Sequence, residues 1–312
     1  MADKKLILVT GGAGFIGSHL CARLVKEGHS VISLDNYFTG SRENHMPAKA
    51  FCTAECSPGT CKVHRDVDYR EGHTKDIEKH IPESPDLIYH LGEYSRVAKS
   101  IEEPALVWNL NMEGTFGVLE FWRTRGGKLV YAGSSTKMAT PRPEGTAGRD
   151  LSPYTWSKAS NTELVRNYGH WYDLPYSIAY FYNVYGPREQ AGEYGTVIEI
   201  FKQKLIKGEP LPVRSPGTQE RIYTHVEDTV DGIILVGEKG VRDEYSIAAK
   251  ESYPILEVAK MFGTDIEMLP ARSTSRPSAA IDTNTEKIKA LGWKQDHTLE
   301  DYIQSIKEEA VK

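Results

Sequence analysis

Two side chains whose types and spacing could move a proton lie in the segment "SPYTWSKASNTELV". Tyr154 and Lys158 are four residues apart, so on a helix they share one face. A positive charge beside a phenol favours the phenolate, which lowers the pKa of the tyrosine and makes it a general base near neutral pH. Ser134 and Ser135 end the apolar run "KLVYAGSS" and could complete a hydroxyl–phenol pair. A tyrosine and a lysine on a solvated helix would show the same spacing, so the pair gains meaning only beside a second motif.

That second motif is the glycine turn in "VTGGAGFIGSHL", where Gly11, Gly14 and Gly17 stand between an apolar run and a helical pattern. The first glycine permits a tight turn, the second lets a pyrophosphate approach the backbone, and the third lets helix and strand pack closely. Phe15 and Ile16 fall in the first turn of the helix, whose open N–H groups would meet the anion. A purely structural turn is the alternative interpretation.

An acidic residue follows the second apolar run, close to the spacing of about 20 residues expected for a ribose-binding carboxylate. Asp35, followed by Asn36, would hold both hydroxyls of the adenosine ribose and repel a 2′-phosphate. The sequence therefore predicts NAD as the cofactor rather than NADP. A role for Asp35 as an ordinary loop or cap residue stays open.

Elements of alternating type must position these groups. Lys5–Thr10 and Ser30–Leu34 are predicted strands, and Phe15–Glu27 is the helix between them. Further apolar runs alternate with helical patterns around Ala105–Thr124 and Pro153–Trp171, which favours an α/β fold with a Rossmann-type doubly wound parallel sheet. We expect residues 1–185 to form the NAD-binding domain and 186–312 a smaller substrate lobe, with a return strand to the sheet near 243–248.

Composition excludes several other classes of function. The 312 residues carry a net charge of −5 with both signs interspersed, so no basic stripe indicates nucleic-acid binding. The first residues lack the features of a signal peptide, and no run of residues is long and apolar enough for a membrane span, so we expect a cytoplasmic protein. Cys52, Cys56 and Cys61 cluster near His64, but their spacing matches no common zinc pattern, and we predict no metal site.

The order of the motifs resembles that of extended short-chain dehydrogenases/reductases of the nucleotide-sugar epimerase/dehydratase family. The motifs are "TGGAGFIG", "LDN", "RDV", "HLGE", "YTWSK", "YFYNVYGPRE" and "LGW", and they span nearly the whole chain. This resemblance implies an NAD-dependent enzyme that acts on a nucleotide-diphosphate sugar and forms a homodimer. It also implies roles for residues at matching positions.

By this resemblance Ser134, Tyr154 and Lys158 form the catalytic set, and Lys158 also holds the nicotinamide ribose. Asp66 and Val67 would bind the adenine, and Leu91 and Gly92 would line the cofactor groove. The implied substrate-binding residues are Ser95, Arg96, Ser135, Asn183, Val197, Arg214, Arg221, Arg272, Arg276 and Ala279. Among these, Arg272 is the second diphosphate-binding arginine with Arg276 as the alternative, and Ala279 gates the space around the 2-substituent of the sugar.

The positions after Ser134 bear on the reaction. A 4,6-dehydratase of the family adds an Asp-Glu pair where this chain has Ser135 and Thr136, and a uronic-acid decarboxylase keeps a glutamate there. Neither hydroxyl is a useful acid or base at neutral pH. We therefore predict epimerisation at carbon 4 through a transient 4-keto sugar. A 4,6-dehydratase or 4-oxidoreductase and, more remotely, a non-catalytic NAD-binding sensor remain alternatives.

Overall fold

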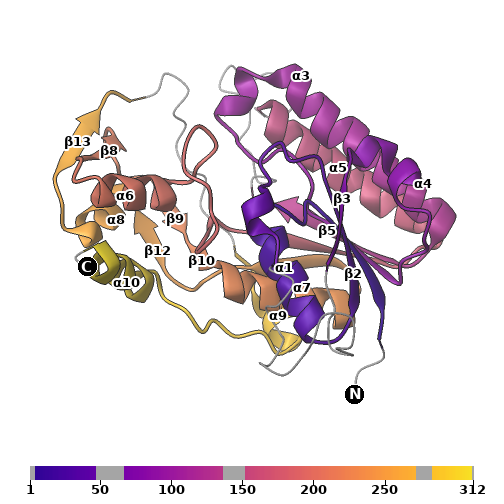
Figure 1. Cartoon of the computed structure of the whole chain (residues 1–312). Helices are drawn as coiled ribbons and strands as arrows, with labels where there is room; N and C mark the ends of the chain where they lie inside the picture. The colour runs from indigo at the N-terminus through magenta and orange to yellow at the C-terminus, as the bar shows by residue number, and fades with distance from the viewer. Residues whose placement is uncertain (1–3, 47–66, 136–151, 272–282, 311–312) are drawn as a thin grey trace, which may run out of the picture.

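The computed structural model describes residues 4–46, 67–135, 152–271 and 283–310. A seven-stranded sheet forms its centre (Figure 1), with the strand order β11-β6-β5-β4-β1-β2-β3 and every neighbouring pair parallel. Its strands are β1 (Leu6–Thr10), β2 (Ser30–Asp35), β3 (Asp68–Glu71), β4 (Leu87–His90), β5 (Lys128–Ser134), β6 (Tyr176–Phe181) and β11 (Arg242–Ile247). The order reverses between β1 and β4, which makes a crevice at the carboxyl ends of these two strands.

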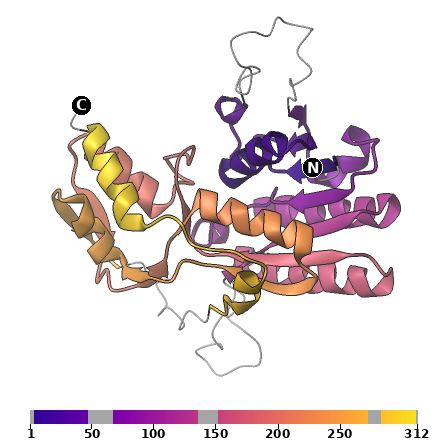
Figure 2. The ribbon, with the colours of Figure 1, turned by 90° about the horizontal axis from the view of Figure 1, so that it is seen from below.

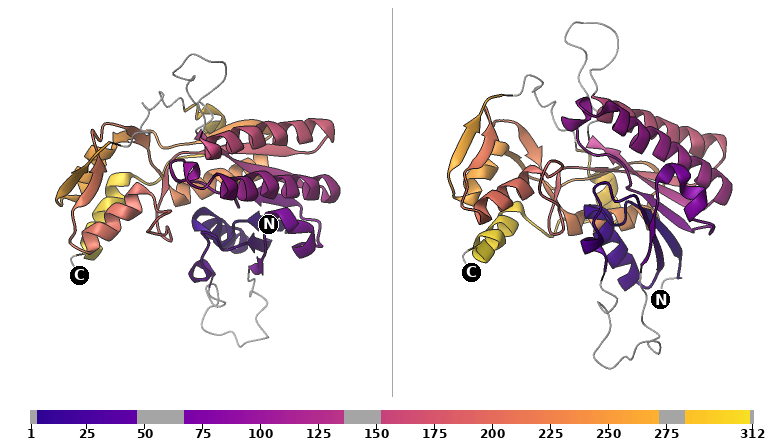
Figure 3. Two further views of the ribbon diagram at one scale, coloured as in Figure 1. Left: turned by 90° about the horizontal axis from the view of Figure 1, so that it is seen from above. Right: turned by 45° about the horizontal axis from the view of Figure 1, so that its top comes forward.

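Alternation along β1 shows how the two faces of the sheet are buried. Ile7 and Val9 pack into one hydrophobic core with α1 and α7, whereas Leu8 packs into a second core with α4 and α5. A strand that is apolar on both sides must have helices on both faces, which is the doubly wound α/β architecture that the sequence predicts. The views in Figure 3 show α4 and α5 side by side on their face of the sheet.

The helices on the two faces of the sheet are α1 (Phe15–Lys26), α2 (Ile77–His80), α3 (Pro104–Val107), α4 (Gly114–Arg125), α5 (Pro153–Trp171), α7 (Val226–Lys239) and α9 (Glu286–Ala290). A six-residue π-helix, η4 (Trp108–Glu113), joins α3 to α4. Short 3-10 turns are η1 (Arg42–Asn44), η2 (Thr74–Asp76) and η3 (Lys99–Ile101).

A smaller lobe lies beside the carboxyl end of the sheet (Figures 1 and 2) and has a hydrophobic core of its own around Phe201 and Phe262. Its helices are α6 (Val197–Ile206), α8 (Ile255–Phe262) and α10 (Leu299–Ala310). Three two-stranded sheets lie in the smaller lobe and where it joins the rest of the molecule. They are formed by β7 (Val184–Tyr185) with β10 (Thr224–His225), β9 (Glu220–Ile222) with β12 (Ser252–Pro254), and β8 (Leu211–Arg214) with β13 (Ile266–Leu269). The division into domains at residue 185 stays a prediction.

Among the helices described here, none is both long enough and apolar enough to cross a bilayer. Within the same residues, no group of three or more His, Cys, Asp or Glu side chains is arranged to hold a metal ion. Cys21 is a buried free thiol on α1, and Cys52, Cys56 and Cys61 lie outside the described residues.

Candidate active site

A cavity of about 440 Å³ opens at the carboxyl end of the sheet. Residues at or just beyond the ends of six sheet strands line it, including Gly11 after β1, Asp35 at the end of β2 and Ser134 at the end of β5. Ligands of doubly wound folds bind at this edge, next to the point where the strand order reverses. The cavity is therefore the candidate active site.

The glycine turn leaves backbone exposed where an anion could approach. Gly11 has φ +73°, and a Cβ built on it would lie 2.9 Å from the Cα of Gly92, so only glycine fits without strain. A Cβ on Gly17 would lie 2.1 Å from the carbonyl oxygen of Gly11, which explains the close packing of α1 on β1. In the described structure no side chain caps α1 and its first turn has no acidic residue, so its N–H groups and dipole favour a bound phosphate.

Asp35 is buried at the wall of the same cavity. Its Oδ2 accepts a hydrogen bond from the backbone N–H of Ala13 at 3.0 Å, and its Oδ1 accepts one from that of Tyr37 at 2.8 Å. Burial raises the pKa of Asp35, and these backbone hydrogen bonds oppose that shift. The carboxylate is thus fixed beside the glycine turn, where a ribose would follow a pyrophosphate bound at α1. The glycine turn and Asp35 together fit an NAD molecule.

Tyr154 and Ser134 face each other across the cavity wall. The hydroxyl of Tyr154 donates to Ser134 Oγ at 3.2 Å. The predicted helix start is confirmed, because Ser152 caps α5 by accepting from the N–H of Thr155 at 3.2 Å and Pro153 takes the first helical position. Tyr154 therefore stands in the first turn of α5 and reaches the end of β5.

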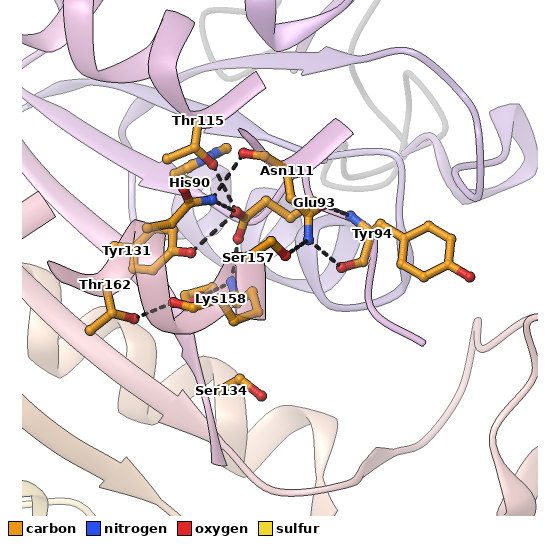
Figure 4. A network of polar contacts seen from close by, with 12 residues as sticks. His90, Glu93, Tyr94, Asn111, Thr115, Tyr131, Ser134, Ser157, Lys158 and Thr162 are labelled. Carbon is orange, nitrogen blue, oxygen red and sulfur yellow. Dashed lines mark hydrogen bonds and ion pairs between the residues drawn. The ribbon is translucent and has the colours of Figure 1, made fainter. Parts of the chain in front are cut away.

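Lys158 stands one turn later on α5 and makes an ion pair with Glu93, which follows β4 (Figure 4). Both side chains are buried, with 6% and 4% of their surface exposed. The ammonium also donates to the carbonyl oxygen of Ala132 and lies 4.4 Å from the centroid of the Tyr131 ring. Burial lowers the pKa of Lys158, and Glu93 opposes that shift.

One prediction made from the sequence is wrong in this arrangement, namely that Lys158 lowers the pKa of Tyr154. Burial raises the pKa of Tyr154, and the charge of Glu93 raises it further, while the hydrogen bond to Ser134 and the charge of Arg96 act in the opposite direction. Burial of the phenol is the largest cause of the raised pKa.

Three neutral donors complete the surroundings of Glu93. Its Oε1 accepts from Thr115 Oγ1 at 2.7 Å, Asn161 Nδ2 at 2.9 Å and Tyr131 Oη at 3.1 Å. Burial alone would raise the pKa of Glu93, but Lys158 and the donated hydrogen bonds lower it overall. Glu93 is therefore held as a carboxylate at the centre of the network in Figure 4, with Ser134 set apart from it.

Behind this network, His90 links β4 to α4. Because Thr115 donates its proton to Glu93, its oxygen must accept from His90 Nε2 at 3.0 Å. The other ring nitrogen, Nδ1, then accepts from Thr10 Oγ1 at 2.7 Å. Burial lowers the pKa of His90 to about 4, so the ring is neutral near neutral pH.

The π-helix η4 places Asn111 where it can hold the loop after β4. The side chain of Asn111 accepts from the N–H of Tyr94 at 2.6 Å and donates to its carbonyl oxygen at 3.1 Å. The carbonyl oxygen of Asn111 accepts from Asn161 Nδ2 at 2.9 Å. Since Asn161 also donates to Glu93, the widened turn connects the loop to the ion pair.

A second pair of charged groups, Arg96 and Glu189, also lines the cavity. Arg96 donates to the carbonyl oxygen of Tyr194 and, through Nη1, to Ser95 Oγ at 3.0 Å. Glu189 is buried and accepts from the N–H of Thr196 at 3.2 Å. Burial raises the pKa of Glu189 to about 7, and Arg96 opposes that shift.

The structure also locates the remaining residues that the sequence analysis named. Phe15, Ile16, Asn36, Leu91, Gly92, Ser135 and Asn183 line the cavity. Val67 is buried in the core beside α1, and Val197, Arg214 and Arg221 lie in the smaller lobe and are not among the described residues that line the cavity. Asp66, Arg272, Arg276 and Ala279 lie outside the described residues.

Known proteins share both this sequence pattern and this fold. Residues 7–248 match the sequence profile of the NAD dependent epimerase/dehydratase family. The chain belongs to this family. Its relatives include a UDP-glucose 4-epimerase of Mycolicibacterium smegmatis, 29% identical over 95% of each chain. A UDP-N-acetyl-alpha-D-glucosaminuronate decarboxylase of Bacillus cytotoxicus is 28% identical over 98% of this chain and 91% of its own.

The solved structures of the family agree with the fold. The UDP-glucose 4-epimerase of Thermotoga maritima, solved with UDP-glucose, is 28% identical, covers 97% of each chain and gives a TM-score of 0.81. This member of the family is therefore an NAD-dependent enzyme with a Rossmann-type sheet, and its glycine turn and Asp35 have the geometry that the cofactor needs.

Two buried carboxylates at the cavity of this family member were missed by reasoning from the sequence. Glu93 was noted only as the last letter of "HLGE", and Glu189 only as the last letter of "YFYNVYGPRE". A charged residue directly after an apolar strand was the available signal for Glu93, since parallel strands end at the ligand-binding edge of the sheet.

Proposed function

We propose that this enzyme catalyses the epimerisation of a nucleotide-diphosphate sugar at carbon 4 through a transient 4-keto sugar. The phenolate oxygen of Tyr154 takes the proton of the sugar 4-hydroxyl, and Ser134 orients that phenolate through the hydrogen bond that joins the two side chains. NAD, when bound, supplies a reversible acceptor for the hydride of carbon 4. Lys158 holds the cofactor ribose, and return of hydride to the other face of the sugar gives the epimer.

The observation that carries this proposal is the hydroxyl pair of Tyr154 and Ser134, 3.2 Å apart at the wall of the cavity, followed in the chain by Ser135 and Thr136. The pair supports removal of the proton from a sugar hydroxyl. Hydroxyl side chains at the next two positions supply no acid there to expel the 6-hydroxyl, which favours return of hydride over dehydration.

The similarity to a decarboxylase and the identity of the residues after Ser134 define the competing reactions. A 4,6-dehydratase or a 4-oxidoreductase would use the same first step and release a different product. Incubation of the purified enzyme with UDP-, dTDP- and GDP-hexoses and with a UDP-hexuronic acid separates them. An epimer has the mass of its substrate, whereas dehydration of a hexose loses water, decarboxylation of the uronic acid loses carbon dioxide, and a released ketose is lighter by two hydrogens.

The sugar that we propose is an N-acetylhexosamine, such as that of UDP-N-acetylglucosamine. Counted from Arg272, Ala279 takes the position that borders the 2-substituent of the sugar. Its methyl side chain leaves room for an acetamido group. If Arg276 is the anchoring arginine, the count reaches Thr283 instead. Comparing initial rates on UDP-glucose and UDP-N-acetylglucosamine tests this assignment.

The proposed assembly is a homodimer that pairs the α3–α5 side of the molecule. Trp108, Phe116 and Trp156 on this side are exposed by 52%, 53% and 43%, and the rings of Trp108 and Trp156 stack at 5.9 Å. Exposed aromatic side chains that gather on one face favour a protein interface. The cytoplasmic location rests on the sequence alone and stays a prediction.

A further inference from the structure

Glu93 is a charged group that the proposed proton transfer does not itself require. Its side chain is 4% exposed and yet ionised, which is costly unless the charge is paired and hydrogen-bonded. Four donors, from α4, β5 and α5, converge on its two oxygens. Residues from distant parts of the chain thus build a site for this one carboxylate.

The pairing determines how Lys158 is used. An ammonium has three N–H donors, and here two of them go to Glu93 and to the carbonyl oxygen of Ala132. One N–H remains for a ligand hydroxyl in the cavity, which Lys158 also lines. The position of the ammonium is fixed, but its charge is balanced by Glu93 and is not available to stabilise a phenolate at Tyr154.

We propose that Glu93 is a positioning residue that holds Lys158 in a neutral ion pair and thereby sets the pH range in which Tyr154 acts as the base. This inference rests on the proposed function, since it assigns Tyr154 and Lys158 the roles given there.

The sign of the effect follows from the charges. Glu93 is negative, so it raises both the pKa of Tyr154 and the pKa of Lys158. The reaction needs the phenolate of Tyr154 and the ammonium of Lys158, so these groups give the acid limb and the alkaline limb of the rate. Removal of the charge of Glu93 therefore shifts both limbs toward acid.

The charge of Glu93 also raises the pKa of His90 and of Tyr131, but burial is the larger cause at both, so neither group ionises near neutral pH. His90 is neutral above about pH 4, and Tyr131, whose hydroxyl also faces Glu93, has its pKa raised well above the ordinary value by burial. The charge of Arg96 interacts with Tyr154 and with Glu189, which has a pKa of about 7. Neither Arg96 nor Glu189 contacts Glu93 in the described structure, so any titration of Glu189 would appear in both proteins.

The first experiment compares pH profiles of kcat for the NAD-loaded natural enzyme and Glu93→Gln, which keeps the shape of the side chain and removes its charge. We expect both limbs to move toward acid by about one pH unit. Glu103→Gln is the matched control, because Glu103 accepts hydrogen bonds from Tyr94 and Tyr194 and carries a carboxylate that does not pair with Lys158. Its limbs should stay in place. If Glu93→Gln has a lower kcat at every pH but keeps both limbs at the pH values of the natural enzyme, the proposal is contradicted.

A second readout does not depend on the sugar. Ultraviolet absorbance, measured as a function of pH, reports the ionisation of tyrosine to phenolate. The titration curve of a protein with Tyr154 minus that of the same protein with Tyr154→Phe gives the ionisation of this one tyrosine. We expect it at lower pH in Glu93→Gln than in the natural protein, and an unchanged midpoint overturns the proposal. Absence of turnover with every nucleotide sugar would instead remove the proposed function, and this titration would still decide the role of Glu93.

In Glu93→Gln the ammonium of Lys158 is buried without a partner, which destabilises the fold. If that variant does not fold, Glu93→Asp replaces it in the titration. Aspartate keeps the charge but draws it away from Lys158 by one methylene group. The midpoint of the Tyr154 titration should move in the same direction by a smaller amount, and a midpoint equal to that of the natural protein would contradict the proposal.

Discussion

The proposed chemistry depends on one hydroxyl, that of Tyr154, held against Ser134 at the cavity. Tyr154→Phe removes only that oxygen, so we expect kcat to fall about 100- to 10,000-fold, the usual contribution of a general base. The bound NAD should remain, because Asp35 and the glycine turn are untouched. Steady-state rates and the NAD released by denaturation measure the two effects.

Tyr168→Phe is the matched control for this prediction. Tyr168 lies on the same helix, and its hydroxyl donates to Glu120 at 2.8 Å, outside the set of residues that line the cavity. It should turn over at nearly the natural rate. Equal losses in the two variants would show that the effect comes from helix α5 and not from a base at Tyr154.

The gate assigned to Ala279 gives a second prediction for a single residue. A bulky side chain there should crowd the acetamido group, so Ala279→Tyr should lower kcat/KM for UDP-N-acetylglucosamine much more than for UDP-glucose. Ala280→Tyr places the same side chain one residue away and should not discriminate between the two sugars. If the natural enzyme strongly prefers UDP-glucose, or if the two variants behave alike, the assignment is wrong.

Local patterns explain why some site residues could be predicted and others could not. Tyr154 and Lys158 are related by one helical turn, so their common face can be read from spacing alone. The environment of Glu93 is different, because Thr115, Tyr131 and Asn161 come from three separate elements and meet only in the folded chain. Because these contacts form only in the folded chain, the pairing of Lys158 with Glu93 cannot be predicted from sequence spacing.

At the scale of elements, the glycine turn, α1 and the alternation of strands and helices were predictable, since each has its own period or turn chemistry. The segment from Ala105 to Thr124 was expected to be one helical stretch, whereas the structure has the π-helix η4 between α3 and α4. A local widening of the helix leaves the apolar pattern nearly unchanged, so the sequence does not reveal it. The widened turn nevertheless places Asn111 against the loop that carries Glu93.

The turn between β1 and α1 gives a prediction about one element. Gly11→Ala should lower the free energy of unfolding and weaken the retention of NAD, because its Cβ would press on Gly92 as well as adopt a left-handed conformation. The conformation alone costs about 1–2 kcal/mol. Urea unfolding and the NAD content of the purified protein measure both effects.

Gly208→Ala separates the contribution of the conformation from that of the contact. Gly208 has φ +65°, close to the angle of Gly11, but no described atom lies within 4 Å of the position its Cβ would take. This variant should lose stability only through its backbone conformation and keep its NAD. A loss of stability as large as that of Gly11→Ala would show that the contact with Gly92 is unimportant.

For the whole molecule, the exposed aromatic side chains on the α3–α5 side lead to a prediction about assembly. Trp108→Glu combined with Trp156→Glu should convert a dimer into a monomer, because two charges would be buried in the interface. Met268→Glu is the control, since Met268 is 49% exposed on β13 of the smaller lobe. Sedimentation velocity gives the masses. A natural protein that sediments as a monomer would contradict the proposed dimer.

The proposed reaction is tested most directly by following UDP-N-acetylglucosamine and UDP-glucose with the purified enzyme in D₂O by proton NMR, with no cofactor added. Hydride that leaves carbon 4 and returns to it must give the 4-epimer with its own hydrogen retained at carbon 4, without incorporation of deuterium and without loss of mass. We expect this product from at least one of the two sugars, with many turnovers for each enzyme molecule. A product that has lost water, or one that carries deuterium at carbon 5, would contradict the account.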